Sequence, residues 1–211
     1  MKTIRTTLAL VLLGAAARPA LAGSDRPFDL NLWGSFIHSS TATITDPNFN
    51  IGINFADGAG FGLTANVPIV RVLSAEMGAF WYRQSAEIVQ GSTRILGAGR
   101  LQSVPIVFLL QFHPNGREGV DPYLGLGAAY TVLGALHDPE LDTAGIGVVS
   151  VDEKFTLAAQ AGMRWALGPG FGLAIDGKYL PMKSKSQSAN GSTVELQLNP
   201  FLISVGASLR F

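Results

Sequence analysis

The sequence predicts an all-β fold, an eight-stranded antiparallel β-barrel that spans a membrane. Three observations favour this fold. The chain ends in a strand with one wholly apolar face, short and long connections alternate along the chain, and the less apolar face of the strands carries mainly small residues. Transmembrane barrels combine outward apolar faces with short turns at one end and long loops at the other.

The last segment, 201–211, has a side-chain period of two. Because successive strand residues point to opposite faces, one of its faces is apolar and the other is mostly small or polar. A final strand of this kind resembles the closing strand of bacterial outer-membrane barrels, and its terminal Phe211 resembles the signal read by the barrel-assembly machinery. The apolar parity is Phe201, Ile203, Val205, Ala207, Leu209 and Phe211; the other is Leu202, Ser204, Gly206, Ser208 and Arg210.

Composition narrows the class of protein. The 211 residues suffice for one domain with an interior. Charged residues are 14% of the chain, against about 25% in ordinary soluble domains. After the N-terminal region, no segment approaches the roughly 20 apolar residues of a membrane-spanning helix. The net charge of zero gives no basic surface for nucleic acid, and the lack of cysteine excludes disulfides, thiolate metal sites and cysteine nucleophiles.

Residues 1–22 have the features of a secretory signal peptide. Lys2 and Arg5 provide the positive start, an apolar core follows over 6–17, and small residues precede an expected cleavage site after Ala22. The apolar core is too short to span a bilayer as a helix. We therefore expect the exported protein to be a single barrel domain, 23–211.

Eight segments with strand-like alternation follow. The sixth alternates most cleanly after the last one, whereas the fourth alternates poorly because Val107 and Leu109 fall on its inward parity. Each is about as long as a strand that crosses a bilayer at a tilt. The expected strands are 28–37, 58–67, 71–82, 101–112, 122–133, 155–165, 171–182 and 194–211.

The connections between these strands alternate in length. The short ones are rich in Pro or Gly, as tight turns require, and the long ones are polar. With an even number of strands, both termini fall at the periplasmic end, where the short turns lie. The short connections are 67–71, 113–120 and 167–170, and the long ones are 39–57, 83–100, 134–152 and 184–192.

A soluble barrel or sandwich with its apolar face inside is the alternative fold. Side-chain size argues against it, because Gly, Ala, Ser and Thr fill a narrow eight-stranded lumen, whereas a soluble surface would carry Lys and Glu. Aromatic residues near the predicted strand ends fit the girdles of a membrane barrel. These aromatics are Phe28, Trp81, Tyr82, Phe112, Tyr130, Phe155, Trp165, Phe171, Tyr179 and Phe211.

Motifs in the second half resemble the outer-membrane protein W (OmpW) family. Residues 121–131, DPYLGLGAAYT, are similar to the family's "PY-hG-hG-x-x-Y-T" fifth strand, in which h is hydrophobic. Residues 157–162, LAAQAG, resemble its sixth strand, and 198–211 resemble its last. The resemblance covers roughly 71–211. It implies a barrel that assists the passage of small hydrophobic molecules, with an apolar funnel near the extracellular end that leads to a lateral gap in the wall.

Inward-facing charges are the first candidate site. Ionisable groups at membrane depth should pair with one another or touch water. Asp176 and Lys178 share one inward face, and Arg164 lies on the adjacent strand. The group forms either a salt-bridge plug that fills the lumen or part of an ion path. Its members are Glu76, Arg164, Asp176, Lys178 and Arg210.

Inward-facing apolar residues are the second candidate site. They either line a hydrophobic funnel or are ordinary packing in a dry barrel. Pro105 and Pro181 interrupt ladders because proline has no backbone N–H, so one of them marks either a gap in the wall or a plain β-bulge. The apolar candidates are Phe80, Val107, Leu109, Leu180 and Met182.

The three histidines point to no metal site. His38 and His137 fall near the extracellular side and His113 at a periplasmic turn. His38, Ser40 and an acidic residue such as Asp46 could form an acyl-transfer trio, as in a lipid-modifying enzyme. We expect no metal and no cofactor.

Three functions remain open. The first is a non-enzymatic outer-membrane barrel for small hydrophobic solutes. The second is a structural or adhesive barrel whose interior charges merely fill the lumen. The third is a lipid-modifying enzyme. Outer-membrane lipid, lipopolysaccharide and the barrel-assembly machinery are the expected partners.

Overall fold

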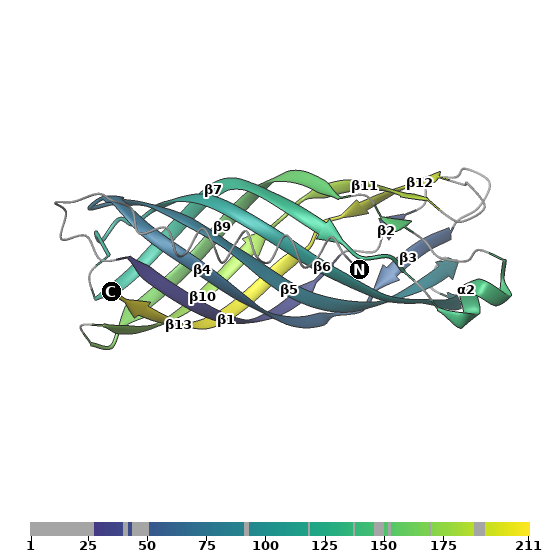
Figure 1. The fold of residues 1–211 in the computed structure, drawn as a ribbon, viewed down its shortest axis with the longest axis horizontal. Helices are drawn as coiled ribbons and strands as arrows, with labels where there is room; N and C mark the ends of the chain where they lie inside the picture. Colours follow the sequence, from purple (N-terminus) through teal and green to yellow (C-terminus); the bar gives the residue numbers. More distant parts are fainter. Residues whose placement is uncertain are drawn as a thin grey trace.

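The computed structural model forms a closed antiparallel barrel (Figure 1). Eight strands close the wall in the order β1-β4-β5-β6-β7-β9-β10-β13, and β13 pairs with β1. The structure describes residues 28–39, 42–43, 51–90, 93–117, 119–136, 138–145, 150–151, 153–168, 170–187 and 193–211. The expected signal peptide lies outside the described residues.

The wall strands are long and continue beyond a bilayer's depth at one end. They are β1 (Asp29–His38), β4 (Gly58–Val70), β5 (Leu73–Gln90), β6 (Thr93–Phe112), β7 (Val120–Leu133), β9 (Lys154–Ala166), β10 (Phe171–Tyr179) and β13 (Phe201–Arg210). The shorter elements are β2 (Ala42–Thr43), β3 (Ile51–Phe55), the helix α2 (Pro139–Thr143), β8 (Ser150–Val151), β11 (Met182–Gln187) and β12 (Thr193–Leu198).

The two ends of the barrel differ. The C-terminus and the short turns lie at one end, and α2 with β11 and β12 lies at the other (Figure 1). We call these the short-turn end and the long-loop end. At the short-turn end the first and last strands seal the wall: the Phe211 amide donates to the Phe28 carbonyl at 3.0 Å, and the two rings stack at 5.1 Å.

The apolar parity of the strands faces outward. Leu126, Leu157 and Val205 are 71%, 76% and 61% exposed, whereas their inward neighbours are small or polar. A soluble barrel would bury these side chains, because exposed apolar area costs about 25 cal/mol per Å² in water. The predicted membrane barrel is therefore confirmed and the soluble alternative is wrong. No helix among the described residues is long and apolar enough to cross a membrane.

The long connections contain more regular structure than the sequence predicted. The expected loop 83–100 continues β5 and β6 as a hairpin, and β3 within 39–57 pairs with β5. The expected loops 134–152 and 184–192 contain α2, β8 and parts of β11. The loop boundaries were wrong because we ended strands where charges begin. Outside the bilayer a hairpin needs only alternation and paired backbone, so charged residues continue it.

Two expected strands are broken where prolines interrupt them. The expected strand 171–182 divides at Leu180 and Pro181 into β10 and β11. The expected strand 194–211 divides at Asn199 and Pro200 into β12 and β13. The pairing register is the same on both sides of this bend, from Tyr179–Phe201 to Met182–Leu198. The two halves therefore bend together and remain one hairpin.

Candidate functional site

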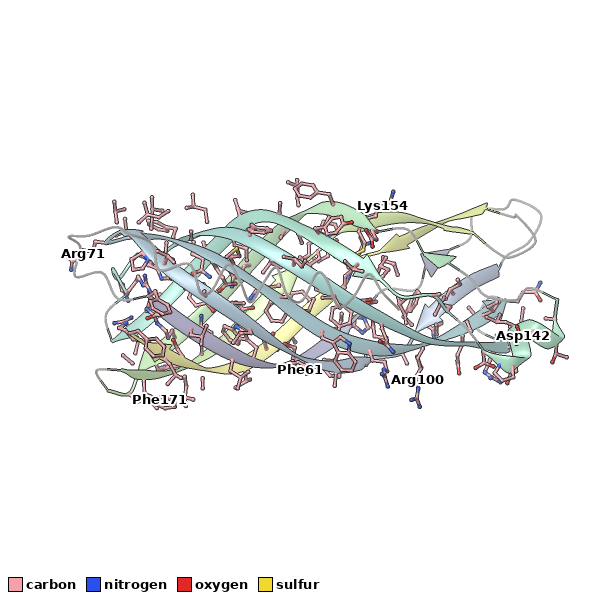
Figure 2. All side chains as sticks on the ribbon, in the orientation of Figure 1. Phe61, Arg71, Arg100, Asp142, Lys154 and Phe171 are labelled. Atoms are coloured by element: carbon pink, nitrogen blue, oxygen red, sulfur yellow. The ribbon has the colours of Figure 1, made fainter. Side chains whose placement is uncertain are left out.

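The barrel interior changes in character along its axis. On β5 the inward side chains run from Ser74 at the short-turn end through Glu76 to Phe80, and so from polar to apolar. The same order on neighbouring strands gives three layers. Described side chains lie inside the lumen, whereas Phe61 and Phe171 project outside it (Figure 2).

The first layer is a short-turn charge cluster, formed by Asp29, His113, Arg117, Asp121, Arg164 and Arg210. Asp29 is buried and accepts hydrogen bonds from Arg210 Nε at 2.9 Å and from Arg117 and Arg164. Arg164 Nη2 also donates to Asp121 Oδ2 at 2.9 Å. The three guanidinium groups and two carboxylates compensate each other's burial, which is the condition for keeping charges inside a membrane protein.

The candidate charges therefore form two groups instead of one. The structure brings Arg164 and Arg210 to Asp29, whereas Asp176 pairs with Lys178. Sequence reasoning missed Asp29, Arg117 and Asp121. Asp29 falls on the inward parity of the first strand, and this signal was enough to include it.

Two members of this cluster, His113 and Asp121, are linked to Ser74 in a row of serine, histidine and aspartate. Ser74 Oγ is 2.7 Å from His113 Nε2, and His113 Nδ1 is 2.9 Å from Asp121 Oδ2. This is the partner order of a serine-hydrolase triad. The Ser74 side chain is fully buried and also donates to Gln111 Oε1 at 3.2 Å. A nucleophile must meet its substrate, so we interpret the three residues as a structural tie between two turns.

The second layer is a central charge cluster, formed by Glu76, Gln111, Tyr123, Gln160, Asp176 and Lys178. Lys178 Nζ lies 2.7 Å from Asp176 Oδ1 and 3.3 Å from Glu76 Oε1. Gln111 Nε2 donates to Glu76 Oε2 at 3.0 Å and to Gln160 Oε1 at 2.9 Å. Tyr123 donates to Asp176 Oδ2 at 3.0 Å. The network joins β5, β6, β7, β9 and β10 and spans the lumen.

Lys178 marks the boundary between the polar and apolar layers. It is fully buried, and its ammonium lies 4.8 Å from the Phe80 ring centroid and 5.2 Å from that of Trp33. Cation–π contact stabilises a desolvated ammonium in such a position. Gly62 makes room for the Phe80 ring, because a Cβ there would lie 2.3 Å from Phe80 Cδ1. The two rings and Lys178 form a floor across the barrel.

The third layer is an apolar cluster that includes the two rings of this floor and extends from it toward the long-loop end. All five apolar candidates lie in it and are at most 4% exposed: Phe80, Val107, Leu109, Leu180 and Met182. Trp33, Ile37, Leu136, Leu141 and Leu202 belong to the same cluster and were missed. Tyr82 also belongs to it, so its assignment to the aromatic girdle was wrong: its side chain is on the inward parity of β5 and is 2% exposed. The inward parity of Trp33 and Ile37 on the first strand was a usable signal. Leu136 and Leu141 come from an expected loop, where strand periodicity gives no signal for inward-facing residues.

The wall beside the apolar cluster is interrupted at both prolines. At Pro105 the β5–β6 ladder passes from Ala79–Ile106 to Tyr82–Ser103 without a change of register. At Pro181 the β9–β10 ladder ends at the pair Ala159–Tyr179. Pairing on this side resumes between β8 and β11 at Val151–Ser186, where the register is shifted by one residue. In the described part of the wall, this second interruption is much the longer of the two.

His38 has an acidic partner, Asp57, where the enzyme hypothesis named Asp46 as its example. Its Nδ1 lies 2.6 Å from Asp57 Oδ1 on the exposed rim of the barrel. Ser40, Asp46 and His137 lie outside the described residues. His38 and His113 lie at opposite ends of the barrel, so they cannot share one metal ion.

Comparison with known proteins agrees with this architecture. The family model described as "OmpW family" matches residues 39–211. Outer membrane protein AlkL of Ectopseudomonas oleovorans is 29% identical over 128 residues, which are 58% of this chain and 54% of AlkL. The sequence match therefore spans about half the length of that relative.

Solved structures show the same fold. The crystal structure of OprG from Pseudomonas aeruginosa superposes with a TM-score of 0.74 at 17% identity, covering 88% of this chain and 97% of OprG. AlkL in lipid bilayers superposes with a TM-score of 0.66 at 20% identity, covering 92% of this chain and 94% of AlkL. These relatives are bacterial outer-membrane proteins, and the chain studied here belongs to the OmpW family.

Proposed function

We propose that this barrel admits small apolar solutes at its extracellular, long-loop end and releases them sideways into the bilayer between β9 and β11. One observation carries the proposal: the apolar cluster ends on a charged floor, and the longest interruption of the described wall lies beside that cluster. Leu180 and Met182 belong to the cluster and flank Pro181 at the edge of the interruption.

The floor favours a lateral route over a route along the axis. Below Phe80 and Trp33 a solute would meet Lys178, Glu76 and Asp176, whose hydrogen bonds span the lumen. Breaking buried charge pairs costs several kcal/mol, and an apolar molecule offers them no compensation. The hydrocarbon core of the membrane is a better environment for such a solute than a polar lumen.

Pro181 supports an opening toward β9 in particular. The Leu180 amide donates to Pro200 at 3.1 Å, so this residue points to the β13 side. Backbone groups of successive strand residues point to opposite neighbours, and Pro181 therefore faces β9. There it offers a carbonyl, which accepts from the Thr156 hydroxyl, but no N–H. On the side of β9, the edge that begins at Leu180 and includes Met182 has no ladder partner until Ser186. At the rise of a strand, this edge is roughly 20 Å long.

Pro105 supports only a small gap. The β5–β6 ladder is paired just before and just after it in one register, and on the other side β7 stays paired with β6 through Pro105–Thr131. An interruption of this kind relaxes the wall locally without separating two strands. We therefore assign the route to the β9–β11 side.

Uptake by whole cells tests the proposed function. Cells that lack the protein and cells that express it are supplied with a long-chain n-alkane, and the initial rate of uptake is measured. We expect a rate several-fold higher in the expressing cells. Uptake of a small hydrophilic sugar serves as the control and should not change, because the polar floor closes the axis. Equal alkane uptake in both strains would support the structural barrel instead.

A further inference from the structure

The helix α2 covers the outer end of the apolar cluster. It lies at the tip of the long-loop end, beside the end of the β5–β6 hairpin (Figure 1). Leu141 on the helix and Leu136 just before it are both fully buried in the cluster that contains Phe80 and Leu180. The rest of the helix is exposed, as Asp142 shows (Figure 2). One apolar side chain of α2 is therefore part of the cluster at its long-loop end.

A set of polar contacts holds α2 against β6. The Gly97 amide donates to Glu140 Oε2 at 2.5 Å, and Arg94 Nη2 lies 3.2 Å from both Glu140 carboxylate oxygens. Arg94 Nε also lies 3.2 Å from Glu87. Asp138 caps the helix by accepting from the Glu140 amide at 3.0 Å. Glu140 is thus the point where the helix is fixed to the wall.

The helix is too short to be stable without these contacts. It has 5 residues, and isolated helices below about 12 residues are marginal in water. Gly145 follows it with a φ of +72°, a left-handed conformation that ends the helix. Apart from the buried Leu141 and the bond from the Gly97 amide, its contacts to the wall are exposed side-chain contacts, unlike the continuous ladders of β5 and β6. Undocking of α2 is therefore separable from opening of the barrel.

We propose that α2 is a lid that docks over the apolar cluster through Leu141 and Glu140 and must undock before a solute reaches the cluster. The claim that an apolar solute passes the lid rests on the proposed function. The claim that the lid moves does not rest on it, and a separate measurement tests that movement.

A disulfide between Gly97 and Asp138 tests whether uptake needs the movement. A Cβ on Gly97 would lie 3.5 Å from Asp138 Cγ, which is about the place of the sulfur of a cysteine at 138, so the two new side chains would be adjacent. The natural chain has no cysteine, so Gly97→Cys with Asp138→Cys forms one defined bond. We expect at least fivefold slower alkane uptake after oxidation and recovery after reduction. The reduced protein and the two single variants are the controls. Equal uptake in the oxidised and reduced states would overturn the lid.

Amide hydrogen exchange tests the movement without any solute. Glu140→Gln keeps the shape of the side chain but weakens its contacts with Arg94 and Gly97. We expect exchange at Leu141 and Ala144 at least threefold faster than in the natural protein, with no change in the β5–β6 ladder. Glu153→Gln makes the same change at a carboxylate whose printed contact is with Tyr130; it is the matched control and should leave α2 unchanged. Unchanged exchange in Glu140→Gln would overturn the lid, whereas absent alkane uptake in the natural protein would overturn only the proposed function.

Discussion

Neutralising both carboxylates of the central charge cluster should destabilise the barrel more than it changes uptake. In the double variant Glu76→Gln, Asp176→Asn, each new amide keeps one oxygen that can accept from Lys178. The charge pairing is lost, and a fully buried ammonium remains beside two aromatic rings without a carboxylate within reach. Alkane uptake should stay within about twofold, because the proposed route lies above this floor.

The magnitude follows from the burial of the three groups. Removing the partner of a buried charge costs about 3–5 kcal/mol. Because the amide oxygens retain part of the hydrogen bonding, we expect the low end, about 3 kcal/mol in the free energy of unfolding. At about 1.4 kcal/mol per factor of ten, this is roughly a hundredfold shift of the unfolding equilibrium.

Equilibrium unfolding in urea, in lipid vesicles, measures the effect through tryptophan fluorescence. Trp33, one of the three tryptophans, lies against Lys178 and contributes to this emission. The control is Glu87→Gln with Asp142→Asn, which removes the same charge from exposed positions and should cost less than about 1 kcal/mol. An unfolding free energy equal to that of the natural protein, with altered uptake, would refute the assignment of these residues to a structural floor.

Three further outcomes are expected. Asp29→Asn removes the negative charge and one of the two acceptor oxygens shared by three arginines. It should lower the unfolding free energy by about 3 kcal/mol in the same urea assay, and a neutral result would contradict the short-turn cluster. Gly62→Ala places a Cβ against Phe80 and should cost about 1–3 kcal/mol, whereas Gly34→Ala, whose Cβ would meet a carbonyl oxygen at 3.8 Å, should be neutral by comparison. The Gly97 amide and then Arg94 lower the pKa of Glu140 below its ordinary 4.5, so docking of α2 is stabilised above pH 4.5 and lost as the pH falls through the lowered pKa. The check is amide exchange at Leu141, corrected for intrinsic rates: we expect it to become faster as the pH falls, and a pH-independent rate would contradict the role of the Glu140 carboxylate.

The alternation of apolar and polar residues along the strands predicted most of the fold. The parity of 201–211 and of the sixth strand predicted which side chains face the bilayer, because a strand side chain has only two directions. The ends of the wall strands could not be predicted in this way. Their extension beyond the bilayer depends on pairing between β3, β5 and β6, which no local pattern records.

The interior was only partly predictable. Inward parity selected Glu76, Asp176 and Lys178, which meet in the barrel. The partner of Arg210 could not be read from neighbouring positions, because Asp29 reaches it only when the first strand pairs with the last. The contact of Glu140 with Gly97 likewise depends on a loop that folds back onto the wall.

Pro105 and Pro181 were the most informative single residues. Their effect on the wall depends on which neighbouring strand the missing N–H would have faced. The sequence predicts that each removes a backbone donor. Only the pairing register shows that the donor missing at Pro181 would have faced β9, and that the edge beyond it stays unpaired as far as Ser186. At Pro105 the ladder resumes after the shortest possible break.

The initial rate of alkane uptake in Pro181→Ala, compared with Pro105→Ala, tests the central claim most directly. Pro181→Ala restores an N–H toward β9 and should allow the edge to pair, so we expect uptake to fall at least threefold at equal amounts of folded protein. Pro105→Ala makes the same chemical change at the short interruption and should leave uptake unchanged. Loss of uptake in Pro105→Ala with full uptake in Pro181→Ala would contradict a lateral route between β9 and β11.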